Sequence, residues 1–155
     1  MDYGIVIEKI HQELKAYWGK GKVADYIPAL AEVEPKRYGI AIETLDGHSF
    51  QVGDADIRFS IQSISKVFAL AMVTRHLGDR IWKFVGREPS GNPFNSLVQL
   101  EYEHGIPRNP FINAGALVVT DRLMSLYEQP KDAILQFVRG ICGNDDIYYD
   151  KHIAR

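Results

Sequence analysis

The sequence predicts a mixed fold of the α/β (α+β) class, and three observations carry this prediction. Residues 38–43 and 49–52 alternate weakly between apolar and polar, as strands do, and the dipeptide Asp46-Gly47 between them is a tight-turn signal. Apolar residues spaced three and four apart predict amphipathic helices elsewhere in the chain. The segment 63–77 is apolar on nearly all sides, which predicts a helix at the centre of the domain.

The other elements follow from helical spacing and from residues that start or stop helices. A first helix is expected over 3–17 and is ended by Gly19, and the proline-punctuated segment 26–30 is a loop or a short helix. Gly78 is the expected C-cap of the central helix. Asp79 is expected to cap a short helix directly after it.

The second half of the chain contains one long loop and two helices. Residues 88–110 are rich in Pro, Gly, Asn and Ser, which predicts an ordered loop with one helical turn near Leu97. A helix is expected over 113–127, and the small residues at its start permit close approach of a neighbour. Pro130 suits the first position of a last helix, which is expected to end at the glycines that follow (Gly140 and Gly143).

Composition is typical of a single globular domain over residues 1–155, with 46% hydrophobic and 25% charged residues. A formal net charge of −2 argues against a general nucleic-acid binder, which needs a basic field. The longest apolar run, 67–73, is far shorter than the roughly 20 residues of a membrane helix. The lone Cys142 excludes an internal disulfide, and the first residues lack the pattern of a signal peptide. We therefore expect a soluble cytoplasmic protein that binds neither nucleic acid nor membrane.

The sharpest chemical feature is the tetrad Ser63-Ile64-Ser65-Lys66. Residues three apart share one face of a helix, so Lys66 can direct its amine towards the Ser63 hydroxyl. A neutral amine can accept the hydroxyl proton and so activate the serine as a nucleophile. Unpaired N–H groups at the start of the helix can help to hold a developing oxyanion.

The same residues also allow structural interpretations. Ser60, Ser63 and Ser65 suit helix caps, and Lys66 suits a surface lysine whose stem lies along apolar side chains. Asn113 is favoured as the N-cap of the following helix, although its amide is equally able to bind a polar ligand. The five histidines lack metal-ligand spacing, so no metal site is expected.

Four segments, in this order, resemble the serine-dependent glutaminases, and the likeness extends from about Gly19 to Arg155. The segments are Gly-Lys-Val-Ala-Asp-Tyr-Ile-Pro at 21–28, Phe-Ser-Ile-Gln-Ser-Ile-Ser-Lys at 59–66, Glu-Pro-Ser-Gly at 88–91 and Asn-Pro-Phe-Ile-Asn-Ala-Gly-Ala at 109–116. The resemblance implies hydrolysis of L-glutamine to L-glutamate and ammonia without a metal or organic cofactor. It also implies the fold of serine β-lactamases and penicillin-binding proteins, an antiparallel sheet flanked by helices.

Carried over by motif, the resemblance also implies a role for each matching residue. Ser63 would be the nucleophile, and its backbone N–H would form half of the oxyanion hole. Lys66 would be the general base, and Tyr26 would contact the substrate and assist proton transfer. Gln62 would shape the pocket, and Asn113 would bind the amino-acid end of glutamine. Family members are homo-oligomers, so a dimer or tetramer is expected.

One departure from the family pattern concerns length. Glutaminase catalytic domains are much longer than this chain, and the part without a match carries further substrate-binding residues and the second oxyanion donor. We therefore expect the sequence to be the N-terminal part of a glutaminase, inactive when alone. Two alternatives remain: a penicillin-binding or β-lactamase-like acyl hydrolase, and a non-catalytic short form that binds glutamine or a full-length partner.

Overall fold

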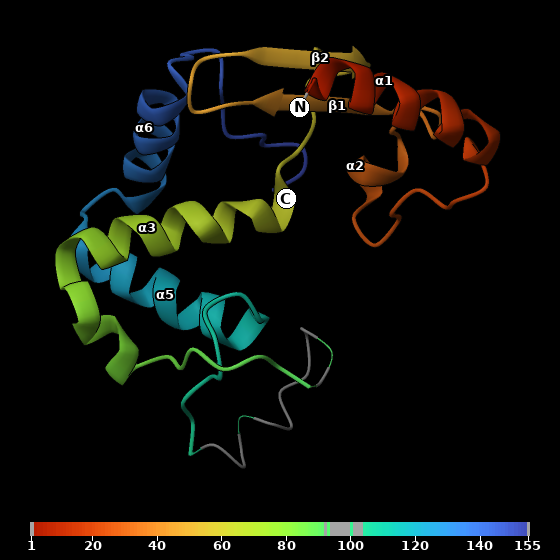
Figure 1. Ribbon diagram of the computed structural model, residues 1–155. Coiled ribbons are helices and arrows are strands. Elements are labelled where there is room, and N and C mark those ends of the chain that lie inside the picture. The colour runs from red at the N-terminus through yellow and green to blue at the C-terminus, as the bar shows by residue number, and fades with distance from the viewer. Residues whose placement is uncertain (1, 92, 94–99, 101–103, 155) are drawn as a thin grey trace. The chain divides into compact units, whose positions relative to one another are not determined.

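The computed structural model describes residues 2–91, 93, 100 and 104–154. These residues form two compact units (Figure 1): the first runs to Ser60 and also includes the segment from Asp150, and the second is Ile61–Tyr149. The helical turn expected near Leu97, and the middle of the loop around it, lie outside the described residues. None of the helices in the described ranges is long and apolar enough to cross a membrane.

The first unit contains the predicted N-terminal helix. Helix α1 spans Tyr3–Leu14, and a 3₁₀ turn over Lys15–Tyr17 continues it. The Asp2 carboxylate caps α1 by accepting the N–H of Ile5 at 3.2 Å. The segment 26–30 contains the start of a short helix rather than only a loop, because α2 spans Pro28–Ala31 with its proline in the first turn.

The predicted hairpin is also confirmed. Strands β1 (Gly39–Glu43) and β2 (Ser49–Gly53) pair antiparallel, and within the described residues they make up the whole sheet. The turn between them includes Gly47 at a φ of 85°, a conformation that favours glycine. Helix α1 packs along this hairpin, as Figure 1 shows, and the rings of Tyr3 and Phe50 meet edge to face.

The second unit is helical in its described part. It consists of a 3₁₀ turn, η2 (Gln62–Ile64), helix α3 (Ser65–Leu77), a 3₁₀ segment, η3 (Gly78–Lys83), and helices α5 (Asn113–Leu126) and α6 (Pro130–Cys142). Helix α3 packs against α5, α6 and η3. The core between these elements is apolar: Ala69, Met72, Val73, Ile81, Val85, Val119 and Leu123. Hydrophobic burial in this core holds α3 beside α5.

Three expectations about the second unit need correction. Helix α3 is central, but it is not buried all round, since Val67 is 51% exposed. Asp79 does not cap the backbone of η3; its carboxylate instead accepts the indole N–H of Trp82 at 3.2 Å. Gly140 does not end α6, which continues through it to Cys142. Only Gly143, in the left-handed conformation, closes the helix.

The small residues at the start of α5 permit a close approach, as predicted, but the neighbour is a piece of backbone. A Cβ atom on Gly115 would overlap the carbonyl oxygen of Asn109. Gly140, inside α6, has no atom within 4 Å of an added Cβ. Gly115 and Gly140 therefore sit in opposite environments, although both lie inside helices.

This difference gives a matched pair of stability predictions. We expect Gly115→Ala to destabilise the protein by more than about 1 kcal/mol, because the Asn109 backbone must move. We expect Gly140→Ala to stabilise it by about 0.5–1 kcal/mol, because alanine favours the helix and finds open space. Urea unfolding of both variants measures the difference, and equal effects would contradict the close approach at Gly115.

Candidate active site

Ser63 lies in the 3₁₀ turn η2, one turn before the regular part of α3, and its side chain is exposed. The tetrad therefore sits at the start of the central helix of its unit, as predicted. Leading N–H groups of a helical segment have no carbonyl partner within the helix, which makes this position favourable for a developing negative charge. In the described part of the chain no hydrogen bond engages the Ser63 hydroxyl.

Gln62 has a φ of 44°, in the left-handed region. An L-residue with a Cβ pays roughly 1–2 kcal/mol for this conformation. Its carbonyl oxygen accepts the N–H of Ser65, so the strained residue closes the turn that presents Ser63. Backbone strain of this kind gathers at functional sites, where the surrounding structure holds it in place.

Lys66 is half-buried in the first turn of α3, and its amine is held by two acceptors. The Nζ atom donates to the carbonyl oxygen of Phe111 at 2.8 Å and to the Oδ1 atom of Asn113 at 2.9 Å. Asn113 is 47 residues away in the sequence. Lys66 is thus a bridge between the start of α3 and the start of α5, rather than a surface lysine with a free amine. No hydrogen bond joins its amine to Ser63 in the described structure.

Asn113 does not cap α5, so the favoured interpretation of this residue is wrong. The N-cap position belongs to Ile112, and no side chain caps there. The Oδ1 atom of Asn113 instead accepts the Lys66 amine, and in the described part of the chain its Nδ2 group has no protein partner. Four residues upstream, the Asn109 side-chain oxygen accepts the N–H groups of Phe111 and Ile112, which precede the helix.

Tyr26 lies in the first unit, just before α2, with 73% of its surface exposed. The other four predicted site residues (Gln62, Ser63, Lys66 and Asn113) all belong to the second unit. A contact of Tyr26 with substrate stays a prediction that rests on its motif.

Sequence reasoning missed two parts of this arrangement. One is the Phe111 carbonyl, a backbone acceptor that no side-chain pattern reveals. The other is Asn109, which begins the motif 109–116 and the dipeptide Asn-Pro, a common turn initiator, but was given no role. Their hydrogen bonds join residues that no sequence pattern pairs, so only the three-dimensional contacts identify them.

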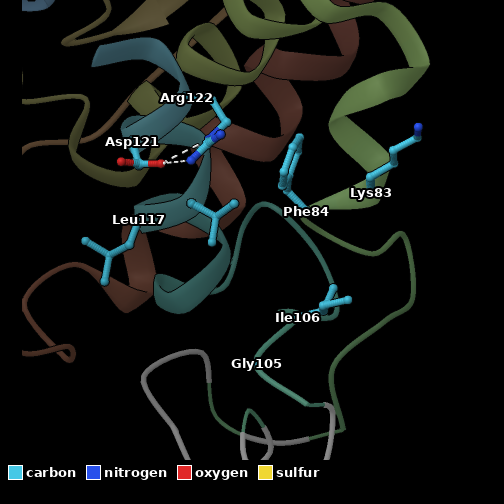
Figure 2. Close-up of a pocket in the computed structure, with 8 residues that line it drawn as sticks. Lys83, Phe84, Gly105, Ile106, Leu117, Asp121 and Arg122 are labelled. Carbon is cyan, nitrogen blue, oxygen red and sulfur yellow. Dashed lines mark hydrogen bonds and ion pairs between the residues drawn. The ribbon is translucent and has the colours of Figure 1, made fainter. Parts of the chain in front are cut away.

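The second unit also has an open cavity of about 420 Å³ that does not include the tetrad (Figure 2). Its lining includes Leu117 and Arg122 of α5 together with Phe84 and Ile106, and the Arg122 guanidinium lies 4.7 Å from the Phe84 ring centre. Within the described residues, no cluster of His, Cys, Asp or Glu could hold a metal ion.

The bridge between Lys66 and Asn113 predicts a measurable coupling. In a double-mutant cycle of Lys66→Met and Asn113→Ala, we expect a coupling free energy of about 1 kcal/mol in unfolding, because the bond joins two helices. The matched control is the pair Lys9 and Glu13, which is 3.9 Å apart with both side chains largely exposed. Its coupling should stay below about 0.5 kcal/mol. Additive effects at Lys66 and Asn113 would contradict the bridge.

Comparison with known proteins shows the family of this chain. The family model described as "Glutaminase" matches residues 21–155. Curated glutaminases of Salmonella arizonae and Salmonella newport are each 58% identical over 151 residues, which cover 97% of this chain and 49% of the relative. The chain therefore spans about half the length of the curated relatives it matches.

Solved structures agree with this result. The probable glutaminase ybaS superposes with a TM-score of 0.77 at 32% identity, over 93% of this chain and 49% of that one. The probable glutaminase of Bacillus subtilis gives a TM-score of 0.77 at 25% identity, over 92% of this chain and 44% of that one. The predicted β-lactamase-like arrangement of helices and antiparallel strands is thus confirmed, and the chain belongs to the glutaminase family.

Proposed function

We propose that this chain carries the nucleophile and the base of an enzyme that hydrolyses L-glutamine to L-glutamate and ammonia. The observation that carries the proposal is the pair of hydrogen bonds that the Lys66 amine donates to Phe111 and Asn113, one turn from an exposed Ser63. Membership of the glutaminase family supports glutamine as the substrate.

The proposed reaction proceeds in two steps. The Ser63 oxygen attacks the carbon of the side-chain amide of glutamine, and the Lys66 amine takes the hydroxyl proton. The backbone N–H of Ser63 supplies half of the oxyanion hole. Collapse of the tetrahedral intermediate, with the proton passed to the leaving nitrogen, releases ammonia and leaves a γ-glutamyl ester on Ser63. Water then attacks the ester, which yields glutamate and the free serine.

The contacts of Lys66 suit this role. A neutral lysine amine has two N–H donors and one lone pair. The Phe111 carbonyl and the Asn113 side chain can take both donors, which leaves the lone pair for the proton of Ser63. The two acceptors thereby orient the base as well as hold it.

The remaining residues are proposed to bind and orient glutamine. Asn113 offers its Nδ2 donor to the amino-acid end of the substrate, while its oxygen holds Lys66. Gln62 shapes the pocket beside the nucleophile, and Tyr26 contacts the substrate and assists proton transfer. The roles of Gln62 and Tyr26 rest on the motifs that they share with the glutaminases.

We also propose that the protein works as a homo-oligomer, a dimer or tetramer, in the cytoplasm, and that residues 1–155 belong to one catalytic domain. Family membership supports the oligomer, and the lone, exposed Cys142 suits a reducing compartment. The proposed reaction uses no metal or organic cofactor, as the resemblance to the glutaminases implies.

The nucleophile assignment is tested by Ser63→Ala in the natural gene product. We expect the rate of ammonia release from glutamine to fall by at least about 1,000-fold, because the attacking oxygen is lost. The matched control is Ser125→Ala, which removes a hydroxyl that bonds to the Asp121 carbonyl within α5. The control should keep full activity. Retained activity in Ser63→Ala would contradict the assignment, and acylation of Ser63 by a labelled penicillin would favour a lactam-directed enzyme instead.

A further inference from the structure

Asn109 makes three side-chain hydrogen bonds, all to backbone groups. Its Oδ1 atom accepts the N–H of Phe111 at 3.0 Å and the N–H of Ile112 at 3.1 Å. Its Nδ2 group donates to the carbonyl oxygen of Glu88 at 3.0 Å. One half-buried side chain therefore ties the turn before α5 to a segment 21 residues upstream.

The backbone around Asn109 is held from both sides. The Gly86 N–H donates to the Pro107 carbonyl at 2.7 Å, and the Glu88 N–H donates to the Arg108 carbonyl at 2.9 Å. An added Cβ on Gly86 would lie 2.5 Å from the Arg108 oxygen, and one on Gly115 would overlap the Asn109 oxygen. The position of Asn109 is thus set by close backbone contacts on two faces.

Both acceptors of the Lys66 amine lie directly downstream of this anchor. The Phe111 carbonyl belongs to a residue whose own N–H is bound by Asn109, and Asn113 follows two residues later. Because the N–H bonds fix the path of the chain through Phe111 and Ile112, they also fix where these two acceptors point. In the described structure no side chain caps the first residue of α5, so the Asn109 bonds are the side-chain contacts that hold the backbone just before it.

We infer that Asn109 is a positioning residue: its bonds to the Phe111 and Ile112 N–H groups aim the Phe111 carbonyl and Asn113 at Lys66, and thereby orient the base towards Ser63. This inference rests on the proposed function for its effect on turnover. Asn109 acts through Phe111, Asn113 and Lys66, and it does not touch the reacting atoms. A residue that only stabilised the fold would alter the folded fraction and leave the turnover of each folded molecule unchanged.

The test compares two substitutions of Asn109 in the natural gene product. Asn109→Ala removes all three bonds, whereas Asn109→Asp keeps the oxygen that accepts from Phe111 and Ile112. We expect kcat per folded molecule to fall by about 10- to 100-fold in Asn109→Ala, as for a misplacement of about 1 Å in a catalytic group, and to fall less in Asn109→Asp.

The matched control is Asn144→Ala. Asn144 follows α6 and accepts the N–H of Asp146 at 2.8 Å, so its loss removes the same kind of turn bond outside the site. We expect unchanged kcat for this variant at a temperature well below its unfolding midpoint. Wild-type kcat in Asn109→Ala, or equal losses in the Ala and Asp variants, would overturn the inference.

A second readout separates this inference from the proposed function. A crystal structure of Asn109→Ala should show the Lys66 amine released from the Phe111 carbonyl or from Asn113, whatever the reaction of the enzyme. Retention of both bonds would overturn the positioning role even if glutamine turnover is confirmed. Absence of glutamine turnover in the wild type, together with release of Lys66 in the variant, would overturn only the proposed function.

Discussion

The candidate site depends on the two hydrogen bonds that the Lys66 amine donates, one to the Phe111 carbonyl oxygen and one to the Asn113 side-chain oxygen. They join the start of α3 to the start of α5, two elements that meet only because apolar side chains between them, including Val73 and Val119, are fully or almost fully buried. Burial of this core thus supplies the free energy that holds α3 against α5. The polar contact at the edge of the core fixes the direction of the Lys66 amine. A lysine in this place without the Phe111 and Asn113 oxygens would lie along the surface with its amine in water.

The path of the chain before α5 is a second requirement. Between Pro107 and Asn113 the backbone passes close to Gly86 on one side and Gly115 on the other, and side chains at either glycine would push it away. Asn109 satisfies two N–H groups that precede the helix and would otherwise lack partners. Two glycines and an asparagine therefore set the path of the backbone that carries both acceptors of the Lys66 amine.

Local sequence signals predicted the secondary structure well, and long-range contacts account for what they missed. Asp46-Gly47 predicted the hairpin, and Pro130 predicted the start of α6, because each effect operates within a few residues. Asn113 was misassigned as a cap, since the choice between the α5 backbone and Lys66 depends on a residue 47 positions away. The strained φ of Gln62 also has no local signature, because a non-glycine residue adopts it only where tertiary structure imposes it.

The central claim is that Ser63 forms a covalent bond with the substrate while Lys66 carries its proton. The most direct measurement is mass spectrometry of the natural gene product after acid quenching during glutamine turnover, with the peptides mapped. The account predicts a γ-glutamyl group on the peptide that contains Ser63, and its loss when the reaction runs to completion. An adduct on another nucleophile, such as the exposed thiol of Cys142, would contradict the account.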